Sequence, residues 1–429
     1  MRRFSHASPG FDAAFDTFLD ERRGSPADVD AAAAEIIEGV RQGGLAAALG
    51  YARRFDRAEL TEDTVRVSPE EIEAGARACE TEVREAIAFA ARRIRTYHER
   101  QRPADARFVD EAGVELGWRW TALESVGVYV PGGRAAYPST VLMNAVPAQV
   151  AGVDRIAMTT PPGRIEPAVL AAAYEAGVSE IWRLGGAHGV AALAYGAGPI
   201  RPVDKIVGPG NAYVTAAKRR LYGVVGIDAL AGPSEIVVVA DADNDPDWIA
   251  ADLLSQAEHD PAAQSILITD SPGFAAAVEA AMERQLQNLV TRTTARESWD
   301  VHGAVVIAPL DAAPGLVDRI APEHVEFAVA DPDTLADRVR HAGAIFLGRY
   351  TPEALGDYVA GSNHVLPTSR SARFSSGLSI YDFLKRTSIA RCDARAFAEL
   401  GPPTVALARA EGLPAHAHAA AVRLGSLRR

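Results

Sequence analysis

The chain has 429 residues, of which 48% are hydrophobic, and it carries a formal net charge of −12 at pH 7. This length predicts two to three domains, and the composition is ample for packed cores. Because lysine and arginine are scattered through acidic helices, the charge argues against a nucleic-acid partner. The sequence has no apolar run of about 20 residues, and its start, MRRFSHASPGFDAAF, has none behind the arginines, so we expect a cytoplasmic protein without a membrane partner.

Residues 1 to about 120 are predicted to form helices rich in Ala, Glu and Arg, with no strong strand among them. From Glu124 onward, short β-rich runs alternate with helical stretches: VGVYV, RIAMTT, EIWRLGG and DKIVG, then EIVVVA, QSILIT, GAVVIA, VEFAV and AIFLG. This alternation predicts an α/β fold with parallel sheets. The first four runs are evenly spaced and the later ones are not, so we expect two sheets.

The domain boundaries follow from these runs. We expect residues 1–20 to form a helical N-terminal extension, and residues 21–125 to join residues 235–378 in a first α/β domain. Residues 126–234 are expected to form a second α/β domain, and residues 379–429 a small C-terminal tail. The double proline of the sequence LGPPT is predicted to interrupt the helices of this tail.

Glycine-rich loops follow three of the predicted strands: VPGGRAAYPS after Tyr129, LGGAHG after Leu184, and VGPGNAY around Gly208 and Gly210. Backbone amides exposed at such turns suit phosphate groups. Each loop taken singly also fits a tight turn that needs glycine, and none has the full G-x-G-x-x-G dinucleotide fingerprint. Three loops at the carboxyl ends of neighbouring parallel strands favour a ligand there.

A polar helix end, DLLSQAEHD, spans Asp252 to Asp260 and places Gln256 and His259 at i and i+3 on one helix face. This spacing suits two ligands of one metal ion, but polar residues with the same spacing also occur at helix ends that are exposed to solvent. Asp357 can add a carboxylate oxygen and His416 a second imidazole, which gives a nitrogen and oxygen set suited to zinc. Cysteine metal clusters and disulfide frameworks are excluded, because the chain has two cysteines that lie far apart and outside every motif.

Other polar residues cluster in short motifs: Ser234 in AGPSE, Glu411 beside His416 in EGLPAHAH, and Glu323 with His324 in APEHVEF. The adjacent Glu323 and His324 offer two groups that titrate toward neutral pH at one point, as general acid and base catalysis requires. The alternative for this pair is a helix end followed by a histidine at the edge of a strand.

The ordered motifs resemble the histidinol dehydrogenase family over nearly the whole chain. The resemblance is carried by VPGGRAAYPSTVLMNAVPAQVAGV, VDKIVGPGNAYV, GIDALAGPSEIVVVAD, WIAADLLSQAEHD, IAPEHVEF, GDYVAGSNHVLPT, ARFSSGLS and EGLPAHA. It implies a zinc-containing homodimer with two Rossmann-like domains that lack the usual dinucleotide fingerprint, and a C-terminal tail that crosses to the partner subunit.

Carried over position by position, the resemblance assigns a role to each candidate residue. It implies zinc ligands, which also bind substrate, at Gln256, His259, Asp357 and His416. Further substrate contacts are implied at Ser234, Glu411 and His324, and an acid and base pair at Glu323 and His324. The implied NAD contacts are Tyr129, His188 and Asn211. His188 departs from the family, which usually has glutamine there. An imidazole replaces one hydrogen bond of that amide but not both its donor and its acceptor at once.

The implied reaction takes L-histidinol through L-histidinal to L-histidine and passes two hydrides to two NAD molecules, as the last steps of histidine biosynthesis. Three alternatives stay open at the level of sequence. A zinc hydrolase uses a similar ligand set, a related enzyme on this scaffold oxidises another small alcohol such as a sulfonated diol, and a non-catalytic assembly protein needs none of these side chains.

Overall fold

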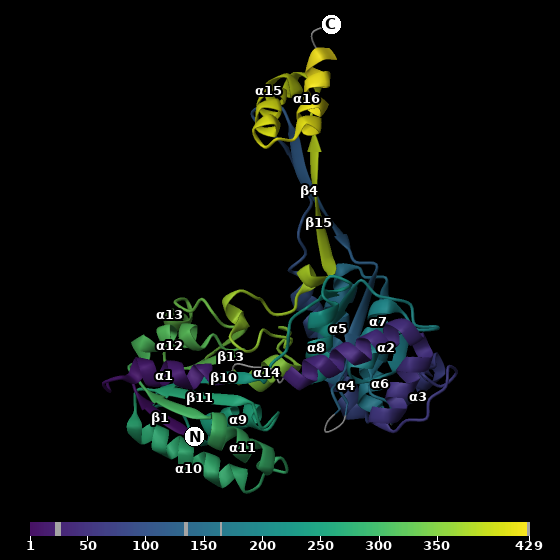
Figure 1. Cartoon of the computed structure of the whole chain (residues 1–429). Helices are drawn as coiled ribbons and strands as arrows, with labels where there is room; N and C mark the ends of the chain where they lie inside the picture. The colour runs from purple at the N-terminus through teal and green to yellow at the C-terminus, as the bar shows by residue number, and fades with distance from the viewer. Residues whose placement is uncertain (22–26, 133–135, 164, 427–429) are drawn as a thin grey trace. The chain divides into compact units, whose positions relative to one another are not determined.

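The computed structural model describes residues 1–21, 27–132, 136–163 and 165–426. The chain divides into two compact units (Figure 1). The first comprises Met1–Arg100 and Glu124–Phe383, and the second comprises Gln101–Leu123 and Leu384–Arg429. In the described ranges, no helix combines the length and the apolar character needed to cross a membrane.

The first unit contains a six-stranded parallel sheet, which we call the first sheet. Its strands, in spatial order, are β1 (Arg2–Ser5), β12 (Ala304–Ile307), β11 (Gln264–Thr269), β10 (Glu235–Ala240), β13 (His324–Ala328) and β14 (Ala344–Leu347). The central strands EIVVVA and QSILIT are buried at every position. Runs of this kind are typical of parallel strands that are covered by helices on both faces.

Helices cover both faces of the first sheet (Figure 1). One face packs against α9 (Pro246–Ala257), α10 (Pro272–Leu286) and α11 (Arg292–His302). The other face packs against α1 (Phe11–Asp20), α12 (Ala313–Ile320) and α13 (Pro332–Ala336). Alternate residues of β10 enter the two cores, as the two-residue period of a strand requires. The short helix α14 (Glu353–Tyr358) follows β14 and contacts α9 and β13.

A second six-stranded sheet lies in the same unit. In spatial order it has β2 (Arg66–Val67), β7 (Glu180–Arg183), β6 (Arg155–Thr160), β5 (Ser125–Tyr129), β8 (Lys205–Val207) and β9 (Gly226–Ile227). The pairing is parallel except between β2 and β7. Its helices are α2 (Ala27–Tyr51), η1 (Ala52–Asp56), α3 (Pro69–Ala78), α4 (Thr81–Glu99), α5 (Pro138–Ala151), α6 (Pro167–Glu175), α7 (Gly186–Tyr195) and α8 (Ala212–Leu221). The predicted α/β fold with two parallel sheets is confirmed.

The N-terminal part of the chain differs from its predicted organisation. Residues 1–20 contain β1, which pairs with β12, and α1, which buries Phe15 in the core of the first sheet. They do not form a separate helical extension. The described part of residues 21–125 does not join the first sheet, because α2 packs on α7 and α8 while β2 pairs with β7. The apolar face of α2 is buried against the second sheet, and this tertiary contact decides where the segment belongs.

The second unit consists of a three-stranded antiparallel sheet and two helices. Its elements are β3 (Ala106–Val109), β4 (Glu115–Ala122), β15 (Leu384–Arg391), α15 (Ala394–Ala410) and α16 (Pro414–Ser426). The double proline predicted to interrupt the tail lies inside α15, so that prediction is wrong. A β-carbon at Gly401 would overlap Leu424 of α16, so close packing of the two helices supports α15 at this point. Short 3-10 turns complete the fold: η2 (Leu310–Ala312) and η3 (Ser371–Arg373), and η4 (Ile380–Phe383) at the end of the first unit.

Candidate active site

The polar candidates of the first sheet gather at the amino ends of its strands. His324 is the first residue of β13, Ser234 directly precedes β10, and Gln256 lies in the last turn of α9, before β11. Ligands of open parallel sheets normally lie at the carboxyl ends, so the location of this cluster departs from the common rule. The loop before β13 and the helix end before β11 bring Glu323, His324 and Gln256 to one edge.

His324 is buried, with 4% of its side chain exposed, and its two ring nitrogens have different surroundings. Nδ1 lies 3.1 Å from the backbone oxygen of Glu235 and 3.2 Å from Oε1 of Glu353. A carbonyl oxygen only accepts, so Nδ1 carries the hydrogen and Nε2 keeps its lone pair. Nε2 is 3.7 Å from Oδ1 of Asp357 and has no hydrogen-bond partner among the described residues. Burial lowers the pKa of His324 to about 3, so the ring is neutral at neutral pH.

Glu323 is buried beside His324 and has a different electrostatic environment. Burial raises the pKa of the Glu323 carboxyl well above its ordinary value, and the nearby Asp357 adds to the effect. Two hydrogen bonds oppose this rise in pKa: the Glu235 amide donates to Oε2 of Glu323 over 3.1 Å, and the Ser234 side chain hydrogen-bonds the same carboxyl. A carboxyl with a raised pKa next to a neutral imidazole is suited to proton transfer.

Gln256 and Asp357 carry the features expected of metal ligands. Gln256 is fully buried, and neither its amide oxygen nor its amide nitrogen has a partner among the described residues. Burying a polar group without a partner is costly, so these atoms fit a site that is completed by a ligand. Burial raises the pKa of Asp357 to about 7. The end of α9 also carries His259, which is exposed and close enough for its charge to lower the pKa values of His324 and His364.

Two residues of this cluster were not predicted from the sequence. Glu353 joins His324 and Asp357 in a group whose ligand atoms lie within 4.8 Å of one another. His364 has Nδ1 3.0 Å from the backbone oxygen of Asp357. His364 belongs to the GSNH motif and was detectable there, whereas Glu353 stands in a short polar helix that has no distinguishing pattern.

The remaining predicted ligands belong to the second unit. Glu411 caps the C-terminal end of α15 and His416 lies in the first turn of α16, and both are exposed. The first unit therefore brings together Ser234, Gln256, His259, Glu323, His324 and Asp357, and it does not contain the other two candidates.

The glycine loops lie at the carboxyl ends of the second sheet, as expected. Tyr129 ends β5, and its hydroxyl accepts a hydrogen bond of 3.0 Å from the Gly186 amide, which joins the first two loops. Burial raises the pKa of Tyr129 to about 12. Asn211 is the N-cap of α8, where its side chain accepts from the amides of Tyr213 and Val214. Within the first loop, residues 133–135 lie outside the described residues.

His188, the departure from the family pattern, lies in the second loop and is buried. Its Nε2 is 3.3 Å from Oδ2 of Asp56, at the end of η1. The ring is also near the aromatic rings of Tyr51 and Phe55, with centroid distances of 6.3 and 6.5 Å. The His188 side chain is therefore directed toward the segment that leaves α2.

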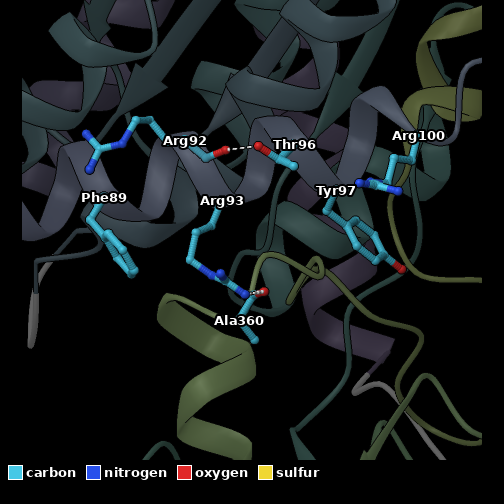
Figure 2. Close-up of a pocket in the computed structure, with 7 residues that line it drawn as sticks. All are labelled: Phe89, Arg92, Arg93, Thr96, Tyr97, Arg100 and Ala360. Atoms are coloured by element: carbon cyan, nitrogen blue, oxygen red, sulfur yellow. Dashed lines mark hydrogen bonds between the residues drawn. The ribbon is translucent and has the colours of Figure 1, made fainter.

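A hollow of about 480 Å³ on the surface of α4 contains none of the predicted site residues (Figure 2). It is lined by Phe89, Arg92, Arg93, Thr96, Tyr97, Arg100 and Ala360. The Arg93 guanidinium donates to the backbone oxygens of Val359 and Ala360, over 2.6 and 2.8 Å. These bonds tie α4 to the segment that directly follows α14, close in sequence to Asp357.

Comparison with known proteins identifies the family. A family model described as histidinol dehydrogenase matches residues 20–424. The chain is 76% identical over 426 residues to the histidinol dehydrogenase of Caulobacter vibrioides, covering 99% of this chain and 100% of that protein. It is 59% identical over 417 residues to that of Mesorhizobium japonicum, covering 96% and 97% of the two chains. The crystal structure of the Elizabethkingia anophelis histidinol dehydrogenase superposes with a TM-score of 0.94 at 34% identity, covering 100% of this chain and 99% of that one.

These matches extend over both sheets of the first unit and over the second unit, so they cover every candidate site residue. The chain belongs to the histidinol dehydrogenase family, whose members are oxidoreductases acting on an alcohol and an aldehyde.

Proposed function

We propose that the protein oxidises L-histidinol through bound L-histidinal to L-histidine, using zinc and two molecules of NAD, as the last steps of histidine biosynthesis. The observation that carries this proposal is a set of buried polar atoms of Gln256 and His324, beside Glu323 and Asp357, that have no hydrogen-bond partner among the described residues. A site for a polar ligand and a metal ion explains why such atoms are buried. We also place the enzyme in the cytoplasm, where its free thiols Cys79 and Cys392 would stay reduced.

The proposed zinc ligands are Gln256, His259, Asp357 and, from the other subunit, His416. The donor set is nitrogen and oxygen, which zinc accepts, and within the described part of the chain the amide oxygen of Gln256 has no other partner. When bound, zinc would hold histidinol through its amine and imidazole nitrogens and so orient the carbon that is oxidised. Ser234 and Glu411 would make further contacts to the substrate.

His324 would act as the base in both oxidations. Its Nδ1 is directed to the Glu235 carbonyl, so the unprotonated Nε2 is the atom available to a substrate hydroxyl. NAD, bound near Tyr129, His188 and Asn211, supplies the hydride acceptor. In the first oxidation Nε2 of His324 takes the hydroxyl proton of histidinol, and in the second it takes a hydroxyl proton of the aldehyde hydrate.

Glu323 would activate the water that hydrates the aldehyde. Its carboxyl is adjacent to His324, with Oε2 of Glu323 3.8 Å from Nδ1 of the ring. A raised pKa makes the ionised Glu323 carboxyl a stronger base toward water than an ordinary carboxylate. The two residues therefore divide the work: His324 acts in both oxidations, and Glu323 acts in the hydration between them.

A direct assay tests the proposal. Purified protein is mixed with L-histidinol and NAD, and the absorbance of NADH is followed together with the formation of histidine. We expect two NADH for each histidine, and loss of activity after zinc is removed and verified by metal analysis. No NADH from histidinol, or an undiminished rate in the metal-free protein, would contradict the proposal.

We further propose that the active sites are shared in a homodimer, with the C-terminal tail of one subunit supplying Glu411 and His416 to the other. The second unit is small and leaves Leu407 66% and Val422 48% exposed, and a partner subunit would cover such side chains. To test it, inactive His324→Ala and His416→Ala chains with different tags are co-expressed, and the heterodimer is purified.

With a crossed tail, one site of the heterodimer combines the intact His324 of the His416→Ala chain with the intact His416 of the His324→Ala chain. The other site carries both substitutions. Roughly half of the wild-type activity should then return, by counting sites in a two-fold dimer. If each tail serves its own subunit, every site carries one defect, and the heterodimer stays as inactive as its parents.

A further inference from the structure

A buried ion pair lies beneath the third glycine loop of the second sheet. Lys218 of α8 and Asp228, directly after β9, form an ion pair in which the side chains are 2% and 4% exposed. Removing two charges from water is expensive, so a buried ion pair gives little net stability compared with apolar residues of the same size. A pair at this position therefore calls for an explanation other than stability.

The two charged groups hold both backbone groups of one glycine. The Lys218 ammonium donates to the Gly208 oxygen over 3.0 Å, and the Gly208 amide donates to Oδ2 of Asp228 over 2.8 Å. Gly208 is buried and has a positive φ of 107°. A β-carbon there would clash with the backbone oxygen of Tyr129, so the position needs glycine.

This arrangement links the ion pair to the residues assigned to NAD. Gly208 lies against the backbone of Tyr129, the Tyr129 hydroxyl accepts from Gly186 of the second loop, and Asn211 opens α8 three residues after Gly208. A shift of Gly208 would move the loop of residues 207–211 relative to Tyr129. Hydrogen bonds to charged groups are stronger than neutral ones, so this pair holds the backbone more firmly than an apolar contact would.

We infer that Lys218 and Asp228 are positioning residues for NAD: they fix the loop of residues 207–211 in the conformation that receives the cofactor. The inference rests on the proposed binding of NAD at Tyr129 and Asn211. Neither side chain is assigned a contact with the cofactor, because both act through the backbone of Gly208.

The test compares Lys218→Met, the double variant Lys218→Met/Asp228→Leu and a control, Arg155→Met. The double variant removes both charges, so we expect it to fold even if the unpaired carboxylate of Lys218→Met prevents folding of the single variant. Arg155 forms an ion pair with Glu180 over 2.9 Å, with side chains 13% and 15% exposed. This control pair lies at the amino ends of β6 and β7, at the opposite edge of the same sheet from the loops.

Two measurements on the full-length, zinc-loaded proteins are needed. Calorimetric titration with NAD in the absence of histidinol gives the Kd for NAD, and hydrogen exchange of the cofactor-free protein reports on residues 205–213. Both Lys218 variants should bind NAD about 10-fold to 100-fold more weakly, from the loss of one or two charge-assisted hydrogen bonds. Exchange in the loop should accelerate, and the KM for histidinol should stay unchanged. Arg155→Met should keep the wild-type Kd.

Wild-type Kd for NAD in the folded double variant, or unchanged exchange in the loop, would overturn the inference. An equal loss of NAD affinity in Arg155→Met would overturn it as well, because the effect would then be one of general stability. If the wild-type protein itself bound no NAD, the proposed cofactor would be wrong and the inference would fail with it. A wild-type protein that binds NAD while the variants bind equally well separates failure of the inference from failure of the proposed function.

Discussion

Gln256 should make the metal-free protein less stable than an apolar residue would. Its side chain is fully buried, and neither amide atom has a partner among the described residues. An unsatisfied buried polar group costs about 1–3 kcal/mol, and Gln256 buries two of them. Gln256→Met replaces the amide by an apolar group of similar length, so we expect the metal-free variant to be about 1–3 kcal/mol more stable after allowing for imperfect packing.

Zinc should reverse this order of stability, so that the wild-type protein becomes more stable than Gln256→Met. A metal that binds the folded state alone stabilises it by an amount that grows with its concentration relative to Kd. The wild-type protein should gain this stability from zinc, whereas Gln256→Met should gain far less because it lacks one of the proposed ligands. Denaturant unfolding in chelator and in excess zinc measures both effects on the same samples.

Gln264, the first residue of β11, is the matched control, since it is also a buried glutamine. Its Nε2 donates to the His302 oxygen over 3.2 Å, so Gln264→Met breaks a bond that exists. This control should lose about 1 kcal/mol without metal and should keep the response to zinc. The reasoning is refuted if metal-free Gln256→Met is less stable than the wild type, or if zinc stabilises it as much as the wild type.

Further predictions concern proton transfer and pH. Glu323→Gln should oxidise histidinol to the aldehyde comparatively well and stall at hydration, whereas His324→Ala should slow both oxidations, which assays with histidinol and with histidinal separate. Equal losses on both substrates for Glu323→Gln would remove its role in hydration. The pKa of Asp357 is raised to about 7, against an ordinary value near 3.9. As pH rises, the unfolded protein therefore loses the Asp357 proton at a lower pH than the folded protein does. Asp357 therefore stabilises the metal-free protein below about pH 4 and loses this contribution as pH rises toward 7, while zinc affinity should increase over the same range. Zinc titrations that show no such increase would contradict the assignment of Asp357.

The sequence identified the parallel strands because their apolar runs are continuous, and it missed strands that lack such runs. β2 has two residues, β1 carries two exposed arginines, and β3 and β4 are largely unburied. These strands exist because a neighbouring strand supplies hydrogen bonds, and a single segment carries little trace of that pairing. The assignment of residues 21–125 failed for a similar reason, since an amphipathic helix does not specify which sheet covers its apolar face.

The candidate site was predictable where chemistry is concentrated in short motifs. Glu323 with His324, and Gln256 with His259, stand close together in sequence, and the family resemblance carried the rest. Glu353 was not predictable, because its position 3.2 Å from Nδ1 of His324 depends on the path of the chain from β14 into α14. The tautomer of His324 was equally hidden, since it depends on the backbone oxygen of Glu235.

Protons and the proposed zinc ion would compete for the same buried atoms in this site. Burial raises the pKa values of Glu323, Glu353 and Asp357. The negative charge of Asp357 raises the pKa values of Glu323 and Glu353 further, and that of Glu323 adds to the rise at Glu353. A divalent cation among these groups reverses the balance, because its charge favours the ionised carboxylates. Zinc binding should therefore lower these pKa values and release protons from the site, so that the Glu323 carboxyl is more fully ionised at neutral pH and ready to receive a proton from water. The pH dependence of aldehyde hydration and the dependence of activity on zinc would then have one electrostatic origin. Replacing zinc by another divalent metal should therefore shift the pH profile of the hydration step.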